Sequence, residues 1–525
     1  MPDVEVVATL LGELKAAAKD SPDRTFAQVD DTEFSYRESF DLVTGAARGL
    51  SSLGIAPGDR VLLLLPNIPE ALWSWLAVGA AGAIDVPVSE DAMGASLART
   101  VAVALPRAVI TTSALLGRLN DAGALGEVAT SIKHVILVDP DATVDATTPY
   151  AKFGDLIHVD DAAAPLPSVR GSDMATVMFS SGSTGAPKGV MIAHEYYATM
   201  AGDYDPFYKL SGSKTVYCPQ PLCHIDARIH VINVLARRGT IVIPRRFSAT
   251  RFWTDVEAAN AEMFSFIGAM LPILMKQPAG PRPATRRVGI GSSIPTAMHA
   301  DFEFRFNTEL IEGYGMTEFP AILNQSLGEG GPGNVGRPLA GAEVRIIDSS
   351  GMPLPQGSVG ELVVRPTRRG AHMQGYWRNP EATVQAWQGL WFHTGDLLQE
   401  LEDGSFRYIG RLKDSIRRRG ENISAWEVER TALAHPGVLD AAAIGVPSPL
   451  GEEDVALVVI PRPDTNLDPA ELRTQMSKDL PRFALPRFID VVADLPKTPS
   501  HRVAKAELRA RGLSVSVYDA EGRPA

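Results

Sequence analysis

The chain has 525 residues, of which 45% are hydrophobic and 21% are charged, a balance typical of a soluble globular protein of roughly two to four domains. Its formal net charge of −12 argues against a broad nucleic-acid-binding surface. No run approaches the ~18 uninterrupted apolar residues of a membrane span, and the acidic N-terminus lacks the features of a signal peptide. Only Cys218 and Cys223 occur, at a spacing that fits no usual metal motif. We therefore expect free thiols in a cytoplasmic protein.

The first part of the chain alternates helical and apolar strand-like segments, which predicts a parallel sheet. The expected elements are a helix and a hairpin within 1–40, an amphipathic helix at 37–54, a buried strand at 59–65, a helix at 68–82 and strands at 84–88, 107–112 and 134–139.

An apolar strand at 175–179 then opens into a loop of Ser, Thr and Gly that ends in Pro187-Lys188-Gly189. Small residues let backbone N–H groups approach an anion, and hydroxyls and a lysine add donors and charge. This composition indicates a phosphate-binding loop. It is not a Walker A loop, because Lys188 follows Pro187 and precedes a glycine. The alternative is a flexible Ser/Gly linker.

The pattern of helix and strand continues through 215–245, with a strand at 240–244, and through 252–310. From 341 onward, short strands at 341–348 and 360–366 are separated by Gly/Pro turns, which suggests an antiparallel sheet or a small barrel. After a break near 410–411 we expect a compact α+β segment. Its expected elements are helices at 425–434 and 469–480 and strands at 439–447 and 454–461.

Six motifs occur in a fixed order. They are SSGSTGAPKG at 180–189, GYGMTE at 313–318, HTGD at 393–396, GRLKD at 410–414, RGENI at 419–423 and PKTPSHRVAK at 496–505. Together they resemble the adenylate-forming superfamily of acyl-CoA synthetases, peptide-synthetase adenylation domains and luciferases. The resemblance implies an α/β fold. Its large N-terminal AMP-binding domain (1–410) combines stacked α/β subdomains with a small β-barrel-like part, and a small mobile α+β lid (411–525) follows.

The resemblance also implies a two-step reaction, in which a carboxylate attacks the α-phosphorus of Mg-ATP and the acyl group then passes to a thiol such as that of CoA. The β- and γ-phosphates would be held by Ser180, Ser181, Gly182, Ser183, Thr184, Gly185 and Lys188. The adenosine and α-phosphate would be held by Gly313, Tyr314, Gly315, Thr317, Asp396 and Arg411. Glu318 would bind Mg²⁺, Lys413 would be the hinge, and Arg419 and Gly420 would line the CoA tunnel. Alternatively, Lys188 is a surface lysine, Glu318 a helix N-terminal charge, and the basic run at 417–419 a solvated face.

The last motif departs from the family pattern, in which a Gly-Lys pair supplies the lysine for adenylation. Here His501-Arg502 stands at that position, and the next basic residue is Lys505. Arginine keeps the charge, but its planar fork differs from an ammonium. This departure has three interpretations. Arg502 performs the role with altered geometry, or Lys505 reaches in through a shifted loop, or the first half-reaction is slower or uses an unusual substrate.

The acyl pocket is expected beside His224 and Asp226, with Gly291 and Ser292 in its floor. A carboxylate near a cavity is costly unless it is paired, so Asp226 faces an amine on the substrate, or it pairs with Arg228 or a helix N-terminus. The segments 246–253 and 418–424 most resemble the crotonobetaine/carnitine–CoA ligase branch. The leading hypothesis is an acid–CoA ligase. The alternatives are a diazotase acting on nitrite and an arylamine, a stand-alone adenylation enzyme that loads a carrier-protein thiol, and an inactive nucleotide-binding paralogue.

Overall fold

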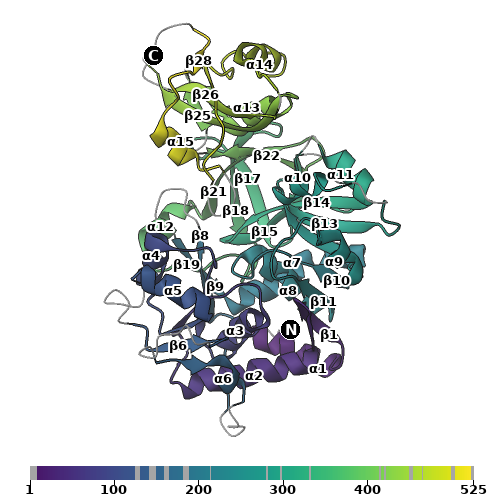
Figure 1. Cartoon of the computed structure of the whole chain (residues 1–525), viewed down its shortest axis with the longest axis vertical. Helices are drawn as coiled ribbons and strands as arrows, with labels where there is room; N and C mark the ends of the chain where they lie inside the picture. The colour runs from purple at the N-terminus through teal and green to yellow at the C-terminus, as the bar shows by residue number, and fades with distance from the viewer. Residues whose placement is uncertain are drawn as a thin grey trace. The chain divides into compact units, whose positions relative to one another are not determined.

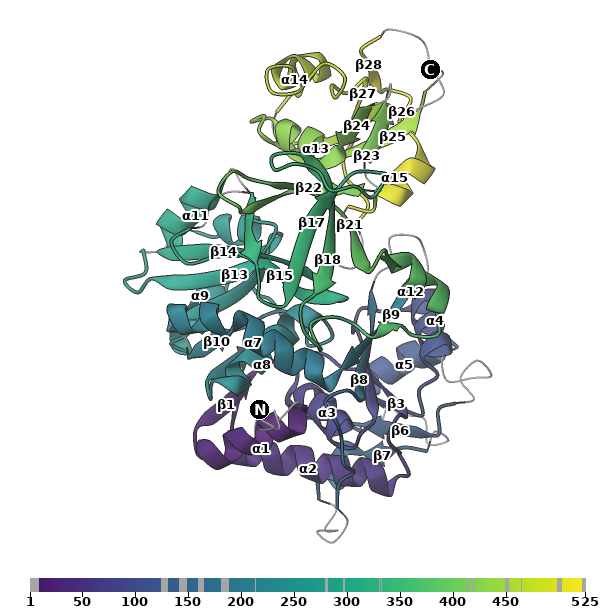
Figure 2. The same ribbon diagram turned by 180° about the vertical axis from the view of Figure 1, so that it is seen from behind.

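The computed structural model describes residues 9–123, 131–140, 149–158, 165–180, 188–212, 214–278, 282–295, 298–329, 331, 333–412, 415–418, 421–448, 453–463, 465–497 and 503–521. These residues form two compact units (Figures 1 and 2), one of Met1–Glu343 with Arg365–Trp391 and one of Val344–Val364 with Phe392–Ala525. The predicted domain boundary at 410/411 falls at the end of a strand of the second unit and remains a prediction.

One sheet of the first unit has the strand order β19 (Gly375–Tyr376), β9 (Lys188–Ala193), β8 (Met174–Ser180), β4 (Ile84–Val88), β3 (Arg60–Leu64), β5 (Ala108–Thr111), β6 (His134–Leu137) and β7 (Ala151–Lys152). β3 is parallel to β4 and to β5, as the alternating pattern predicts. These strands are mostly apolar and almost fully buried, as is typical of parallel sheets, which helices cover on both faces. The β8–β9 hairpin is antiparallel, which the sequence analysis did not anticipate.

The other sheet of this unit runs β16 (Asn334–Pro338), β15 (Phe319–Asn324), β14 (Thr308–Met316), β13 (Arg287–Ser292), β12 (Met263–Ile267), β10 (Thr215–Tyr217), β11 (Thr240–Ile243), β1 (Thr25–Val29) and β2 (Thr32–Ser35). β20 is Trp387–Gln388. The helices of the first unit are α1 (Leu10–Asp20), α2 (Tyr36–Ser52), α3 (Pro69–Ala80), α4 (Gly94–Ala104), α5 (Ser113–Asp121), α6 (Phe153–Ile157), α7 (His194–Ser211), α8 (Ile225–Ala236), α9 (Phe252–Ala258), α10 (Met270–Met275), α11 (His299–Phe306) and α12 (Pro380–Ala386). Ser35 and Glu38 form a capping box that starts α2. The helix and the hairpin expected within 1–40 are confirmed as α1 and β1–β2.

The second unit contains the antiparallel order β17 (Ala342–Ile347), β18 (Val359–Pro366), β21 (Trp391–Glu400) and β22 (Phe406–Arg411), which confirms the antiparallel sheet expected after residue 341. A hairpin follows, β23 (Ser415–Arg418) and β24 (Glu421–Ser424), and then the order β25 (Val438–Pro447), β26 (Glu453–Pro461), β27 (Phe488–Val491) and β28 (Tyr518–Asp519). The helices are α13 (Ala425–Leu433), α14 (Pro469–Met476) and α15 (Lys505–Arg511). The expected α+β character is confirmed, and within the described residues no helix is both long and apolar enough to cross a membrane.

Candidate active site

An antiparallel hairpin holds both ends of the predicted phosphate loop. β8 ends at Ser180 and β9 begins at Lys188, and these residues are partners across the hairpin. The side chain of Ser180 and the loop residues between the strands lie outside the described part of the chain. These loop residues include the predicted phosphate ligands Ser181, Gly182, Ser183, Thr184 and Gly185. The Lys188 ammonium lies 4.9 Å from the centroid of the Tyr376 ring. Because Tyr376 belongs to β19, which pairs with β9, the sheet itself fixes this contact.

The turn between β14 and β15 carries Thr317 and Glu318. The Tyr376 hydroxyl donates a hydrogen bond of 2.9 Å to Glu318 Oε1, and the Tyr196 hydroxyl donates one of 2.9 Å to the carbonyl oxygen of Thr317. Burial raises the pKa of Tyr376, and the charge of Glu318 raises it further, so Tyr376 remains a donor. The structure therefore gathers Lys188, Tyr376 and Glu318. The sequence analysis missed Tyr376, since its role depends on strand pairing and no motif marks it.

The glycines on either side of Tyr314 are explained by the close approach of the neighbouring strand β15. A Cβ on Gly315 would lie 2.2 Å from the carbonyl oxygen of Pro320, and one on Gly313 would lie 2.9 Å from Asn324 Oδ1. No side chain fits at Gly315 without moving backbone, so the close pairing of β14 with β15 requires glycine there. Tyr314 itself is 7% exposed. Its predicted role as the adenine-binding ring remains a prediction.

The predicted pocket floor at Gly291 and Ser292 is tied to a buried carboxyl, Glu312, that the sequence analysis missed. Gly291 on β13 is the register partner of Glu312 on β14, and the backbone N–H of Ser293 donates to Glu312 Oε1 at 2.6 Å. Ser293 has a φ of +64°, a conformation that costs energy for a non-glycine residue. Burial raises the pKa of Glu312 to about 7, against the lowering effect of the backbone N–H groups of Ser293 and Ile294. The only sequence signal was a carboxylate next to the apolar residues Leu310 and Ile311.

His224 and Asp226 lie at the start of α8, and both are exposed to solvent. His224 is the N-cap residue, and the charge and hydrogen bond of neighbouring Cys223 raise its pKa to about 9, with Asp226 adding to the effect against desolvation. Arg228 is fully buried, and its Nη2 binds Asp85 Oδ2 at 2.7 Å. Arg228, one suggested partner of Asp226, is therefore already paired with Asp85. The position of Asp226 in the first turn of α8 fits the other suggestion, an interaction with the helix N-terminus.

In the second unit, the predicted ribose ligands Asp396 and Arg411 lie together. Arg411 Nε is 2.9 Å from Asp396 Oδ1, and Asp396 is 1% exposed. Glu361 shapes this motif, because its carboxylate binds His393 Nδ1 at 2.9 Å and accepts from the Gly395 backbone N–H at 3.0 Å. Gly395 has a φ of +68°, which favours glycine. Glu361 is a further residue that the sequence analysis named only as part of a strand.

The remaining predicted residues of the C-terminal part have different outcomes. Lys413, Arg419, Gly420 and Arg502 lie outside the described residues. Lys505 begins α15, and its Nζ binds Glu429 Oε1 on α13 at 2.7 Å. Since Glu429 Oε1 also accepts from the Ala443 backbone N–H at 2.7 Å, Lys505 is held within its own unit.

A magnesium site at Glu318 would be completed by the substrate. No group of three or more His, Cys, Asp and Glu side chains suited to a metal ion occurs within the described ranges. Mg²⁺ commonly takes one or two carboxylates and fills its other positions with phosphate oxygens and water. Glu318 as the single protein carboxylate fits that donor set.

Comparison with known proteins agrees with these features. The family model for the AMP-binding enzyme matches residues 14–377, and that for the AMP-binding enzyme C-terminal domain matches residues 427–502. The sulfoacetate–CoA ligase of Cupriavidus necator is 31% identical over 96% of this chain and 98% of its own length. The crotonobetaine/carnitine–CoA ligase of Salmonella enteritidis is 29% identical over 91% of this chain and 93% of its own.

The fold also matches solved structures. The crystal structure of ATP-bound MatB from Rhodopseudomonas palustris superposes with a TM-score of 0.86 and 26% identity, over 96% of this chain and 98% of that one. The α/β fold with a large N-terminal part and a smaller C-terminal part is thereby confirmed. The match to the sulfoacetate–CoA ligase covers nearly the whole chain. The two family models match successive parts of the chain, an N-terminal and a C-terminal one, as the order of the motifs predicts. The chain belongs to the AMP-binding enzyme family, the adenylate-forming ligases that its motifs resemble.

Proposed function

We propose that this protein is an ATP-dependent acid–CoA ligase that forms an acyl-adenylate and then an acyl thioester. The observation that carries the proposal is the grouping of Lys188, Tyr376 and Glu318 beside the phosphate-loop hairpin. This places a cation and a carboxylate, both suited to Mg-ATP, on two segments joined by one tyrosine. The names of the relatives, ligases of sulfoacetate and of crotonobetaine or carnitine with CoA, support CoA as acceptor.

In the first half-reaction, a carboxylate oxygen of the acid attacks the α-phosphorus and pyrophosphate leaves. Lys188 and the hairpin loop neutralise the charge of the departing pyrophosphate. Tyr376 orients Glu318 by donating a hydrogen bond to its Oε1. This bond also fixes the direction of the other carboxylate oxygen. Magnesium, when bound there, would neutralise phosphate charge. In the second half-reaction, the CoA sulfur attacks the acyl carbonyl, a C–S bond forms and AMP leaves.

The adenylation cation is Arg502 in this proposal. Lys505 begins a helix and is bound to Glu429, with its side chain only 16% exposed. Reaching a substrate would require Lys505 to break that ion pair. Arg502 carries the charge at the position of the family lysine, and its planar fork suits two acceptor oxygens at once.

The test is AMP release from ATP, first with sulfoacetate, carnitine or crotonobetaine plus CoA and then with nitrite plus an arylamine. Thioester formation with any of these acids supports the proposal. AMP release only with nitrite and the amine would assign a diazotase instead. Acyl transfer to a carrier-protein thiol but not to CoA would assign a stand-alone adenylation enzyme. Absence of AMP release under all conditions would contradict a ligase function.

A further inference from the structure

Residues 367–374 contain neither helix nor strand and connect β18 to β19, the strand that carries Tyr376. We call this segment the strap. It contacts three residues of α7, Glu195, Thr199 and Asp203. Because these residues are spaced four apart, they lie on one side of the helix. The strap is therefore held against a single face of α7 before the chain reaches Tyr376.

Arg368 supplies the buried ionic contact between the strap and α7. Its Nη2 binds Asp203 Oδ1 and donates to the carbonyl oxygen of Thr199 at 3.4 Å. The side chain of Asp203 is 2% exposed and that of Arg368 is 43% exposed, so the carboxylate is buried and the cation reaches the surface. A buried carboxylate is costly unless a cation or hydrogen bonds compensate its charge. The pair therefore holds the strap more firmly than an ion pair in water would.

Gly370 brings the backbone of the strap into direct contact with α7. Its φ is +76°, and a Cβ there would lie 2.5 Å from Thr199 Oγ1 and 2.6 Å from the carbonyl oxygen of Glu195. Both conditions favour glycine. The Thr199 hydroxyl also donates to the carbonyl oxygen of Arg369 at 3.1 Å. Side-chain and backbone contacts thus fix the strap at adjacent positions.

Beyond α7, the strap binds both segments that carry charged residues of the candidate site. The Met373 N–H donates to the carbonyl oxygen of Glu318 at 2.8 Å, and the N–H of the next residue donates to the carbonyl oxygen of Met191 on β9 at 2.8 Å. Tyr376 follows at once, with its hydroxyl 2.9 Å from Glu318 Oε1 and its ring under Lys188. The position of the strap therefore sets the position of Tyr376 between the two charges.

We propose that the strap positions Tyr376 for the binding of Mg-ATP, and that Arg368, through Asp203, is a positioning residue for this step. The proposal rests on the proposed function, in which Glu318 binds magnesium and Lys188 neutralises phosphate charge. Arg368 binds α7, so it acts on the nucleotide through Tyr376. When its contact with Asp203 is lost, the strap loosens on α7 and the Tyr376 hydroxyl loses its fixed distance from Glu318.

The test is a double-mutant cycle between Arg368→Met and Tyr376→Phe. Equilibrium binding gives the Kd of Mg-ATP for the parent, both single variants and the double variant. Pyrophosphate exchange at saturating Mg-ATP, with whichever of sulfoacetate, carnitine or crotonobetaine is exchanged faster, gives the rate. Gly370→Ala loosens the strap by a second route, since its Cβ crowds Thr199 while Arg368 and Asp203 are unchanged. Amide hydrogen exchange of residues 367–374 reports on the strap directly.

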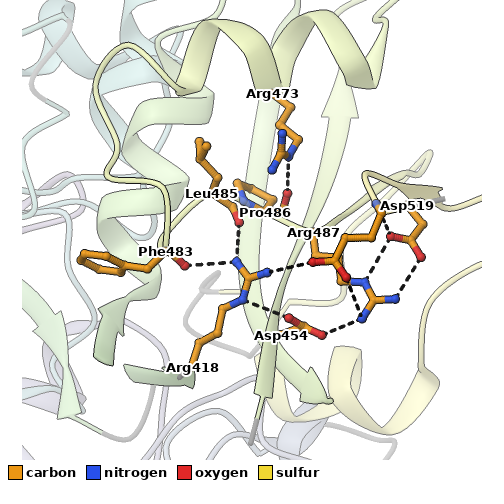
Figure 3. Close-up of polar contacts among 9 residues, drawn as sticks. Arg418, Asp454, Arg473, Phe483, Leu485, Pro486, Arg487 and Asp519 are labelled. Atoms are coloured by element: carbon orange, nitrogen blue, oxygen red, sulfur yellow. Dashed lines mark hydrogen bonds and ion pairs between the residues drawn. The ribbon is translucent and has the colours of Figure 1, made fainter. Parts of the chain in front are cut away.

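Two control variants remove an arginine–carboxylate pair elsewhere. Arg365 lies just before the strap, and its Nε binds Glu343 Oε2 at 2.9 Å, so Arg365→Met removes a neighbouring ion pair. In the second unit, Arg487 binds both carboxylate oxygens of Asp519, at 3.2 Å from Nε and 3.1 Å from Nη2 (Figure 3). Asp519→Asn removes that bidentate pair. Thermal unfolding establishes that each variant folds.

We expect Arg368→Met to raise the Kd of Mg-ATP by about three- to tenfold, up to the effect of Tyr376→Phe, while the saturated exchange rate stays within about twofold. In the Tyr376→Phe background the same substitution should leave the Kd nearly unchanged, because the hydroxyl that the strap positions is already absent. Gly370→Ala should reproduce both results, and Arg368→Lys, which keeps the charge, should fall between Arg368→Met and the parent. Amide exchange of the strap should rise in Arg368→Met and Gly370→Ala and in neither control.

The full effect of Arg368→Met in the Tyr376→Phe background, or an equal rise of the Kd in the two controls, would overturn the proposal. So would an unchanged Kd in a folded Gly370→Ala protein whose strap exchanges faster. The cycle needs neither an acid nor CoA for its binding measurements. If the parent binds Mg-ATP but forms no thioester, the proposed function fails, while the Kd values still decide whether the strap positions Tyr376.

Discussion

Two lysines that sequence patterns marked for catalysis, Lys188 and Lys505, lie in different surroundings. The Lys188 ammonium lies over the face of Tyr376, whose hydroxyl binds Glu318. Lys505 is joined directly to the carboxylate of Glu429. The contact between Lys188 and Tyr376 is a cation–π interaction, whereas the contact between Lys505 and Glu429 is an ion pair of opposite charges. A motif identifies a cation by its type and spacing, but only the fold reveals which groups already share its charge.

The largest expected effect is the loss of the Lys188 charge. Lys188→Met should lower the rate of pyrophosphate exchange on the order of 10²–10³-fold, since a preorganised charge at the leaving group is removed. Lys188→Arg keeps the charge in another shape and serves as the control. Circular dichroism and thermal unfolding establish that both variants fold. Full pyrophosphate exchange in Lys188→Met would contradict the role of the Lys188 charge in adenylation.

The pH dependence of stability should show the buried carboxyl of Glu312. Its folded-state pKa of about 7 lies above its ordinary value of 4.5, so the folded protein retains a proton that the unfolded chain releases. The free energy of unfolding should therefore fall as pH rises from about 4.5 to 7 and then level off, by about 3 kcal/mol from this group.

Glu312→Gln should remove that decline. The variant and the parent should have similar urea midpoints near pH 4.5 and differ progressively toward pH 7.5, where the variant is the more stable. Because Gln keeps an acceptor for the Ser293 N–H, the loop at 291–295 should survive. A constant difference between the two proteins at all pH values would contradict the assigned titration.

Tyr376→Phe tests the link between the cation and the carboxylate. The ring under Lys188 remains, but Glu318 loses its donor, so the KM for Mg-ATP should rise by about tenfold, the value of one hydrogen bond to a charged group. The Tyr196→Phe variant removes the 2.9 Å bond to the carbonyl oxygen of Thr317 and is the matched control. Equal effects in both variants would mean that Tyr376 acts only through general packing.

The sequence predicted most of the fold because its signals are local. The parallel strands β3, β4 and β5 are apolar runs of the right length, and Ser35 with Glu38 marks the start of α2. The missed site residues depend on partners distant in sequence. Tyr376 matters because β19 pairs with β9, Glu312 because it is the register partner of Gly291, and Glu361 because β18 pairs with β21. Likewise, Arg418 reads as part of a charged run until strand packing buries it beside Asp454.

The smallest expected effect belongs to Lys505. Lys505→Met should leave pyrophosphate exchange within about threefold while lowering the free energy of unfolding by about 1–2 kcal/mol, because a partly buried carboxylate on α13 loses its cation. Arg502→Ala, measured beside it, should lose most of the exchange activity with little change in stability. If Lys505 is instead the adenylation cation, Lys505→Met should lose most of the pyrophosphate exchange activity and Arg502→Ala should keep it. Loss of adenylation in Lys505→Met at unchanged stability would show that Lys505 leaves Glu429 during the reaction, and that the ion pair is a resting state of the catalytic residue.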